Sequence, residues 1–177
     1  MPALRSLFIL TAGLALAASA GAAPLDNPGF EAGDFSGWTT FGLGWRIGTG
    51  EDAATGASGA VCDVLPGQTG EPWRGLFQNV PVASGSTYTA GVDLRTVNLR
   101  EAAAWLELQW LDENDTVLNQ LQSDWFTIDQ PFTAVTLPAV TAPPDAVAAS
   151  IRGIVFIEYP ADEPEFIIFD NFRFERQ

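Results

Sequence analysis

Short strand-like runs recur along most of this chain, and turn-forming residues separate them. The breaks are rich in glycine, proline, asparagine and aspartate, as in Pro66-Gly67 and Pro143-Pro144-Asp145. No window of helix length shows a convincing helical period. Many short strands at this spacing are typical of a β-sandwich or a barrel. We therefore predict an all-β fold with strands over residues 37–41, 45–48, 60–65, 76–82, 87–97, 103–112, 116–121, 132–140, 146–157 and 166–174.

Residues 100–111 contain alanines that would also suit a helix, but their apolar residues fit a two-residue period better. In this strand Leu106, Leu108 and Trp110 are expected to point inward. In the strand 87–97, Tyr88, Ala90, Val92 and Leu94 are expected to point inward by the same alternation. If the two strands pair, one outer face carries Asp93, Arg95, Trp105, Glu107 and Gln109.

The first residues have the layout of a secretory signal. Arg5 precedes a short apolar run, and the small residues Ala18-Ser19-Ala20 or Ala20-Gly21-Ala22 suit cleavage. The apolar run is shorter than the roughly 20 residues that a membrane-spanning helix needs. We predict a cleaved signal over residues 1–22, a secreted protein, and one domain over residues 23–177.

The chain is strongly acidic, with a net charge of −14, no histidine and one cysteine. Such a surface repels nucleic-acid phosphates and anionic lipids, so we predict neither a nucleic-acid nor a membrane partner. The absence of histidine excludes histidine-dependent triads and typical zinc sites. Cys62 cannot form an intramolecular disulfide, and its strand-like surroundings predict a small buried apolar residue.

Each end of the predicted domain places an acid among aromatic residues: Glu31 within residues 27–38, and Asp170 between Phe169 and Phe172. Burying a carboxylate is costly unless a partner compensates its charge. We read both segments as β-like and predict that they meet around a cation.

Several motifs follow one another in an order that resembles the secreted carbohydrate-binding modules of the family 4, 9 and 22 type. They are Asn27-Pro28-Gly29-Phe30-Glu31 with Ser36-Gly37-Trp38, Ala57-Ser58-Gly59, the run 76–82 with Gly85 and Thr87-Tyr88-Thr89, the run 105–115, and Phe169-Asp170-Asn171-Phe172. The resemblance covers nearly the whole predicted domain. It implies an antiparallel β-sandwich, the jelly roll of the galactose-binding-like fold.

The resemblance also implies a structural calcium ion held by Glu31, Asp170 and nearby backbone carbonyls, with Asp52 as a further candidate ligand. Calcium takes six to eight oxygen ligands, which the joined chain ends of such a fold can supply. The alternative is that each acid caps backbone N–H groups or pairs with an arginine.

A polysaccharide or oligosaccharide is the ligand that the resemblance implies. Tryptophan rings stack on the C–H faces of sugars, and polar side chains bond to their hydroxyls. The predicted outer face offers Trp105 as an exposed platform with Glu107, Gln109, Arg95 and Asp93, and the loop residues Trp73 and Trp125 can wall it. The alternative is a solvated sheet face with no ligand. Trp38 and Trp110 are expected in the core, and Trp45 suits either place.

Catalysis is the weakest of the functions considered. A glycoside hydrolase needs two carboxylates about 5–10 Å apart, and Asp93 with Glu107 is the pair that the predicted face offers. Any acidic sheet offers such a pair, so we predict a non-catalytic, monomeric carbohydrate-binding module rather than an enzyme. Two alternatives stay open: a cell-surface or matrix protein that uses the sandwich for protein contacts, and a polysaccharide-acting hydrolase.

Overall fold

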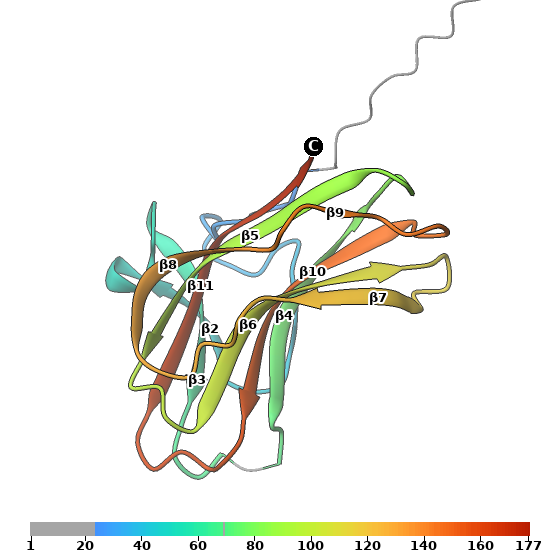
Figure 1. Ribbon diagram of the computed structural model, residues 1–177. Helices are drawn as coiled ribbons and strands as arrows, with labels where there is room; N and C mark the ends of the chain where they lie inside the picture. Colours follow the sequence, from blue (N-terminus) through green and yellow to red (C-terminus); the bar gives the residue numbers. More distant parts are fainter. Residues whose placement is uncertain (1–23, 69) are drawn as a thin grey trace, which may run out of the picture.

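The computed structural model describes residues 24–68 and 70–177, so the predicted signal lies outside the described residues. Two antiparallel sheets pack face to face as a β-sandwich (Figure 1). The five-stranded sheet has the order β1 (Thr39–Phe41), β4 (Trp73–Pro81), β10 (Ala148–Ile157), β6 (Ala102–Leu111) and β7 (Val117–Gln122). The six-stranded sheet has the order β2 (Trp45–Thr49), β3 (Ser58–Val64), β11 (Glu165–Arg176), β5 (Thr87–Val97) and β8 (Gln130–Thr136), with β9 (Val140–Thr141) also paired to β5.

The predicted all-β jelly roll is confirmed, and most strands lie within a few residues of their predicted bounds. β5 spans the predicted residues, and residues 102–111 form a strand rather than a helix. The predicted run 132–140 is divided into β8 and β9, because Leu137, Pro138 and Ala139 are irregular. The only helical element among the described residues is the short 3-10 turn η1 (Gly50–Asp52), and no helix there is long and apolar enough to cross a membrane.

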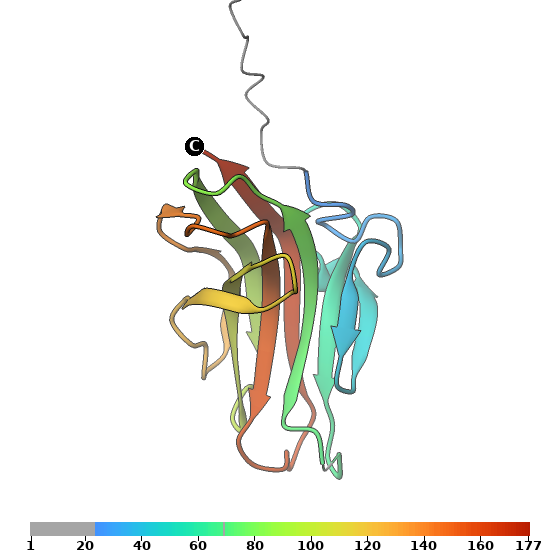
Figure 2. The same cartoon turned by 90° about the vertical axis from the view of Figure 1, so that its right-hand side faces the viewer.

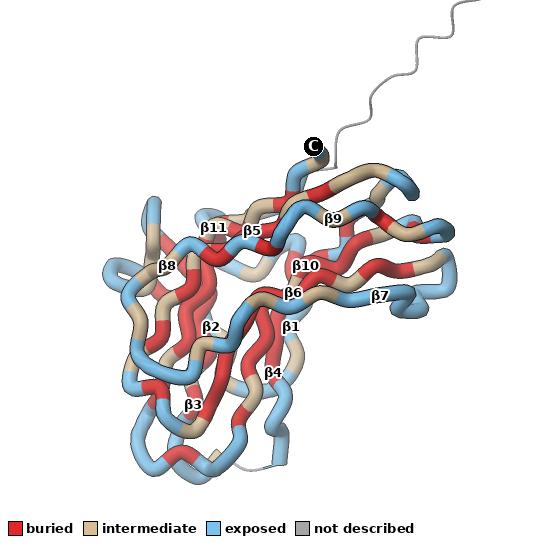
Figure 3. The backbone as a smooth tube through the Cα atoms, in the orientation of Figure 1, coloured by how far each residue is buried: buried red, intermediate tan, exposed pale blue. Residues whose placement is uncertain are grey.

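The main hydrophobic core lies between the sheets and follows the predicted alternation. Leu106, Leu108 and Trp110 of β6 face the core, where they meet Tyr88 and its neighbours on β5. Figure 3 shows buried residues gathered in the central strands, whereas β7 is largely exposed. Cys62 is fully buried in this core, which confirms its predicted place, and burial raises the pKa of its thiol to about 12.

Consecutive strands β5 and β6 belong to different sheets. β5 pairs with β11 and β8, and β6 pairs with β10 and β7. The condition on which the predicted shared face depended, the pairing of these two strands, is therefore not met, because the connection at 98–101 crosses from one sheet to the other. Asp93 and Arg95 lie on the outer face of the six-stranded sheet, and Glu107 lies on the outer face of the five-stranded sheet.

The opening segment is a series of turns over residues 26–37, not the β-like run that we expected. It still lies against the closing strand: the Phe172 N–H donates to the Pro28 carbonyl at 3.0 Å, and the Trp38 and Phe172 rings are 4.5 Å apart. In Figure 2 this blue segment lies at the end of the sandwich that carries the C-terminus. The packing of two distant aromatic residues thus brings the two ends of the domain together.

Candidate carbohydrate-binding face

The centre of the outer face of the five-stranded sheet is a polar network around the buried Glu107. The register places Glu107 of β6 opposite Arg152 of β10 on one side and Gln122 of β7 on the other. Gln109 and Gln122 each donate a side-chain N–H to one carboxylate oxygen at 2.8 Å. Arg152 Nη1 lies 3.3 Å from Glu107 Oε1. The carboxylate is therefore compensated on both oxygens.

Arg152 is held in place by aromatic rings as well as by Glu107. Its guanidinium carbon lies 5.6 Å from the ring centre of Phe41 and 5.5 Å from that of Phe77, a distance at which a cation is attracted to the ring face. Burial lowers the pKa of this guanidinium, and the charge of Glu107 opposes that shift. Since the two charges neutralise each other, the centre of this face carries no net charge.

Three tryptophans form one end of the same face, and here the prediction for Trp105 needs correction. Trp105 points outward as expected, into a cluster separate from the main core, but only 1% of it is exposed. Trp125 stacks flat on it, with ring centres 4.6 Å apart and planes 8° apart, and Trp73 meets it edge-on at 5.9 Å. The exposed rings are Trp73, at 52%, and Trp125, at 50%. Trp105 is thus the support beneath the aromatic surface, not the surface itself.

Asp93 and Arg95 are removed from this face by the strand order. Asp93 accepts hydrogen bonds from Arg173 at 3.0 Å and from Asn171 at 2.9 Å. Arg95 donates to the Glu51 carbonyl and lies over the Phe132 ring. Both residues tie together loops and strands on the outer side of the six-stranded sheet.

Arg152 and Gln122 are residues of this face that our sequence reasoning missed. The alternation in β10 places Arg152 outward, between the inward Ile151 and Gly153, and the same alternation in β7 places Gln122 outward. That periodic signal was present in the sequence. The missing information was that β10 and β7, rather than β5, flank β6.

The two acids of the chain ends converge, as predicted. Asp170 is fully buried and accepts hydrogen bonds from the backbone N–H groups of Ala54, Thr55 and Asn171 at 2.8, 3.2 and 2.6 Å. Burial raises its pKa, and the nearby negative charge of Glu31 raises it further.

Glu31 accepts hydrogen bonds from the backbone N–H groups of Ala57 and Ser58 at 3.0 and 3.1 Å. Residues 54–58 are therefore held to both ends of the domain by two carboxylates. A side chain at Gly29 would meet Asp170 Oδ1 and Asn171 Oδ1 at 3.3 Å, so glycine allows the opening segment to approach this closely. No ion pair among the described residues includes either acid.

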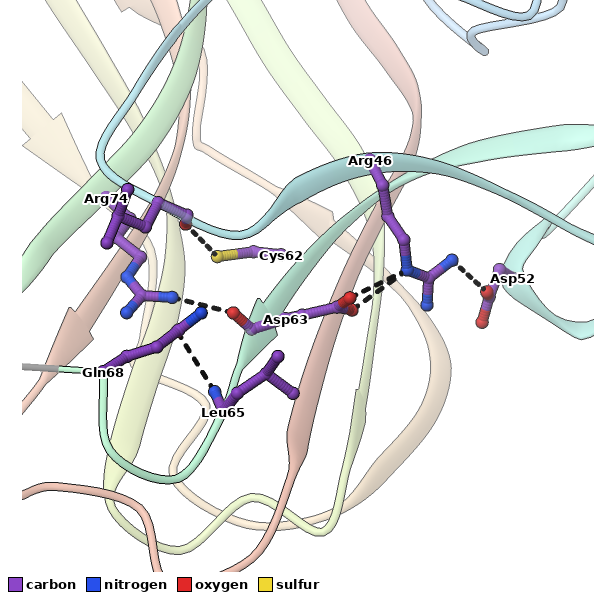
Figure 4. A network of polar contacts seen from close by, with 8 residues as sticks. Arg46, Asp52, Cys62, Asp63, Leu65, Gln68 and Arg74 are labelled. Atoms are coloured by element: carbon purple, nitrogen blue, oxygen red, sulfur yellow. Dashed lines mark hydrogen bonds and ion pairs between the residues drawn. The ribbon is translucent and has the colours of Figure 1, made fainter.

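Asp52, the third candidate ligand, lies in a different network (Figure 4). Its carboxylate pairs with Arg46 at 3.1 Å, and Arg46 also pairs with Asp63 at 3.0 Å. Within residues 24–68 and 70–177, no three acidic, histidine or cysteine side chains gather in a way that could hold a metal ion. A cation at the chain ends would therefore depend on Glu31 and Asp170 together with amide and carbonyl oxygens.

Comparisons with known proteins find the fold in several solved structures. The enzymatically active domain of tailspike protein 4 from bacteriophage CBA120 is 17% identical with a TM-score of 0.66, over 86% of this chain and 21% of that one. TmCBM61, solved with β-1,4-galactotriose, is 16% identical with a TM-score of 0.62, over 86% and 97% of the chains. A cyclase from Fischerella sp. TAU is 21% identical with a TM-score of 0.63, over 88% and 97%.

No family model and no curated protein matches this chain. The C-terminal family 22 carbohydrate-binding module of Clostridium thermocellum Xyn10B also shares the architecture, with a TM-score of 0.59 and 16% identity over 87% of this chain and 96% of that one. The chain thus has the jelly-roll fold seen in several carbohydrate-binding modules, as the sequence motifs predicted.

Proposed function

We propose that this protein is a secreted, non-catalytic carbohydrate-binding module that binds a glycan on the outer face of the five-stranded sheet. The observation that carries this proposal is the exposed Trp73 and Trp125 rings beside the neutral Glu107–Arg152 network. Flat aromatic surface next to fixed hydrogen-bonding groups is the combination that sugars require. Modules of the same fold, such as the one solved with β-1,4-galactotriose, support this assignment.

In this proposal each part of the face has a distinct task. Trp125, backed by Trp105, offers its free side to the C–H face of a sugar ring. Both oxygens of Glu107 already accept hydrogen bonds, so its task is to orient Gln109 and Gln122. The remaining N–H and C=O groups of these two amides then bond to sugar hydroxyls. Such bonds largely replace bonds to water, so we expect modest affinity.

The geometry gives little support to hydrolysis. The suggested acid pair, Asp93 and Glu107, lies on outer faces of opposite sheets. Packed sheets are about 10 Å apart and both side chains point away from the interface, so they cannot flank one glycosidic bond.

The proposed face is tested by affinity electrophoresis and titration calorimetry against a panel of neutral polysaccharides. Trp125→Ala is expected to weaken binding at least about tenfold, because the stacking contact between the Trp125 ring and a sugar ring is lost and water takes its place. Ile128→Ala, which removes an exposed apolar side chain beside the other sheet, is the control and is expected to bind like the parent. Unchanged binding by Trp125→Ala would contradict the proposal, and a stable oligomer that buries this face would favour the protein-contact alternative.

We also propose a structural calcium ion at the chain ends, with Glu31 and Asp170 as its anionic ligands. Two features fit a cation there: the acids are close enough for the charge of Glu31 to raise the pKa of Asp170, and neither has a basic partner in the described chain. Asn171 and nearby carbonyls offer the further hard oxygen ligands that calcium prefers. Asp52 is left out because Arg46 engages it.

Calcium removal tests this second proposal through thermal stability. A chelator is expected to lower the Tm of the parent, because the ion binds only the folded state. Asp170→Asn is expected to show no such shift. If the chelator removes all metal from the parent and the Tm stays unchanged, the proposed ion is contradicted.

A further inference from the structure

A groove of about 430 Å³ lies beside the proposed carbohydrate-binding face, at the edge where the two sheets approach. One wall is the segment 122–126, which follows β7, and the other is the end of β8 with residues 137–138. In Figure 1 the chain runs from β7 to β8 along this edge. The volume falls within the range of about 300–1,000 Å³ that small-ligand sites occupy.

The groove and the face share Gln122. Its side-chain amide donates one hydrogen bond to Glu107 at 2.8 Å on the face, and the same residue lines the groove. Residues 122–126 separate the face from the groove. Their backbone is fixed, because Phe126 and Ala104 exchange two backbone hydrogen bonds at 2.8 and 3.0 Å. Trp125 therefore stacks on Trp105 on one side of the segment, while Asp124 and Phe126 line the groove on the other.

The groove holds a polar group that the protein itself leaves open. Within the described chain, the Asp124 carboxylate has no hydrogen-bond or ion-pair partner, and Asp124 is exposed. The half-buried Phe126 adds an apolar surface beside it. A group that accepts hydrogen bonds from hydroxyls, next to an apolar surface, suits a sugar ring, and the unpaired carboxylate disfavours an anionic one.

We propose that this groove takes a neutral single-sugar branch of a polysaccharide whose main chain lies on the outer face of the five-stranded sheet. This inference rests on the proposed function and adds its ligand class: branched neutral glycans rather than linear ones. A branch that leaves the main chain at Gln122 lies next to the groove, because this residue borders both surfaces.

The test compares branched and unbranched oligosaccharides with equal main chains by titration calorimetry. The probes are galactose-substituted and plain manno-oligosaccharides, and arabinose-substituted and plain xylo-oligosaccharides. Where the parent binds the main chain of a pair, it is expected to bind the branched member about tenfold more tightly than the plain one, the effect of one or two net hydrogen bonds. Asp124→Ala, which removes the unpaired carboxylate from the groove, is expected to abolish that preference and to leave the affinity for the plain chain unchanged.

Glu163→Ala removes a carboxylate at an exposed position outside the groove and is expected to keep the preference. Equal affinity of the parent for both members of a bound pair would overturn the branch site while leaving the proposed function intact. A preference that survives Asp124→Ala would also overturn it. Failure of the parent to bind any of these probes or the wider polysaccharide panel would overturn both proposals.

Discussion

Glu107 and Asp170 are buried carboxylates on the outer faces of opposite sheets, and their charges are met in different ways. Glu107 has a guanidinium and two side-chain amides as partners. Asp170 has three backbone N–H groups and a second carboxylate nearby, and its pKa is raised. The first arrangement is electrically complete and suits an uncharged ligand. The second retains negative charge and suits a cation.

The covering of the two acids differs as well. Near Glu107 the sheet is covered by Trp125, which stacks on Trp105, and by Trp73, which meets Trp105 edge-on, whereas Asp170 is covered by backbone of residues 54–55 and by the opening segment. Side-chain rings on a regular sheet leave a broad, exposed aromatic surface. Loop backbone closes a small polar site. Each region thus has a buried carboxylate at its centre, but the surface beside Glu107 is open to a ligand and the surroundings of Asp170 are closed.

Removing Trp105 should have the largest effect on this comparison. Trp105→Ala is expected to lower the free energy of unfolding by about 4 kcal/mol, because it empties a buried site between Trp73 and Trp125. Trp125→Ala, at a half-exposed ring, is expected to cost much less stability while weakening glycan binding. Urea denaturation followed by fluorescence measures both variants. Equal destabilisation by the two substitutions would show that Trp105 is not the supporting ring.

Breaking the pair at Glu107 should have the next largest effect. Arg152→Ala is expected to cost about 3 kcal/mol, because the nearly buried Glu107 would lose its cationic partner. Arg95→Ala is the matched control on the other sheet. Its partner Glu51 is highly exposed, so the expected cost is less than about 1 kcal/mol. Similar losses for both arginines in urea denaturation would remove the distinction between the two faces.

Local sequence pattern predicted the strands and their inward sides, because alternation and turn residues are read from neighbouring positions. The bounds of β5 and the inward Leu106 and Leu108 followed from that pattern. Strand order is set by contacts between distant segments, so the partners of Glu107 on β10 and β7 were not predicted. The same reason explains Trp105: its cover, Trp125, belongs to the segment after β7. The meeting of Glu31 and Asp170 was predicted through motifs at both chain ends.

The pH dependence of stability should show the smallest of these effects and isolates the uncompensated charge of Asp170. Burial and Glu31 raise the pKa of Asp170 in the folded protein above its value in the unfolded chain. Between these two pKa values the folded state binds more protons, so this group makes the metal-free protein less stable as pH rises from about 4 toward neutrality. Asp170→Asn removes that dependence. In the absence of metal, the Tm of this variant is therefore expected to rise relative to the Tm of the parent as the pH increases toward neutrality. The measurement is the difference in Tm between the two proteins from pH 4 to 7 in chelator, because other acids then cancel. A pH-independent difference would show that the charge of Asp170 is already compensated, and the contrast with Glu107 would be lost.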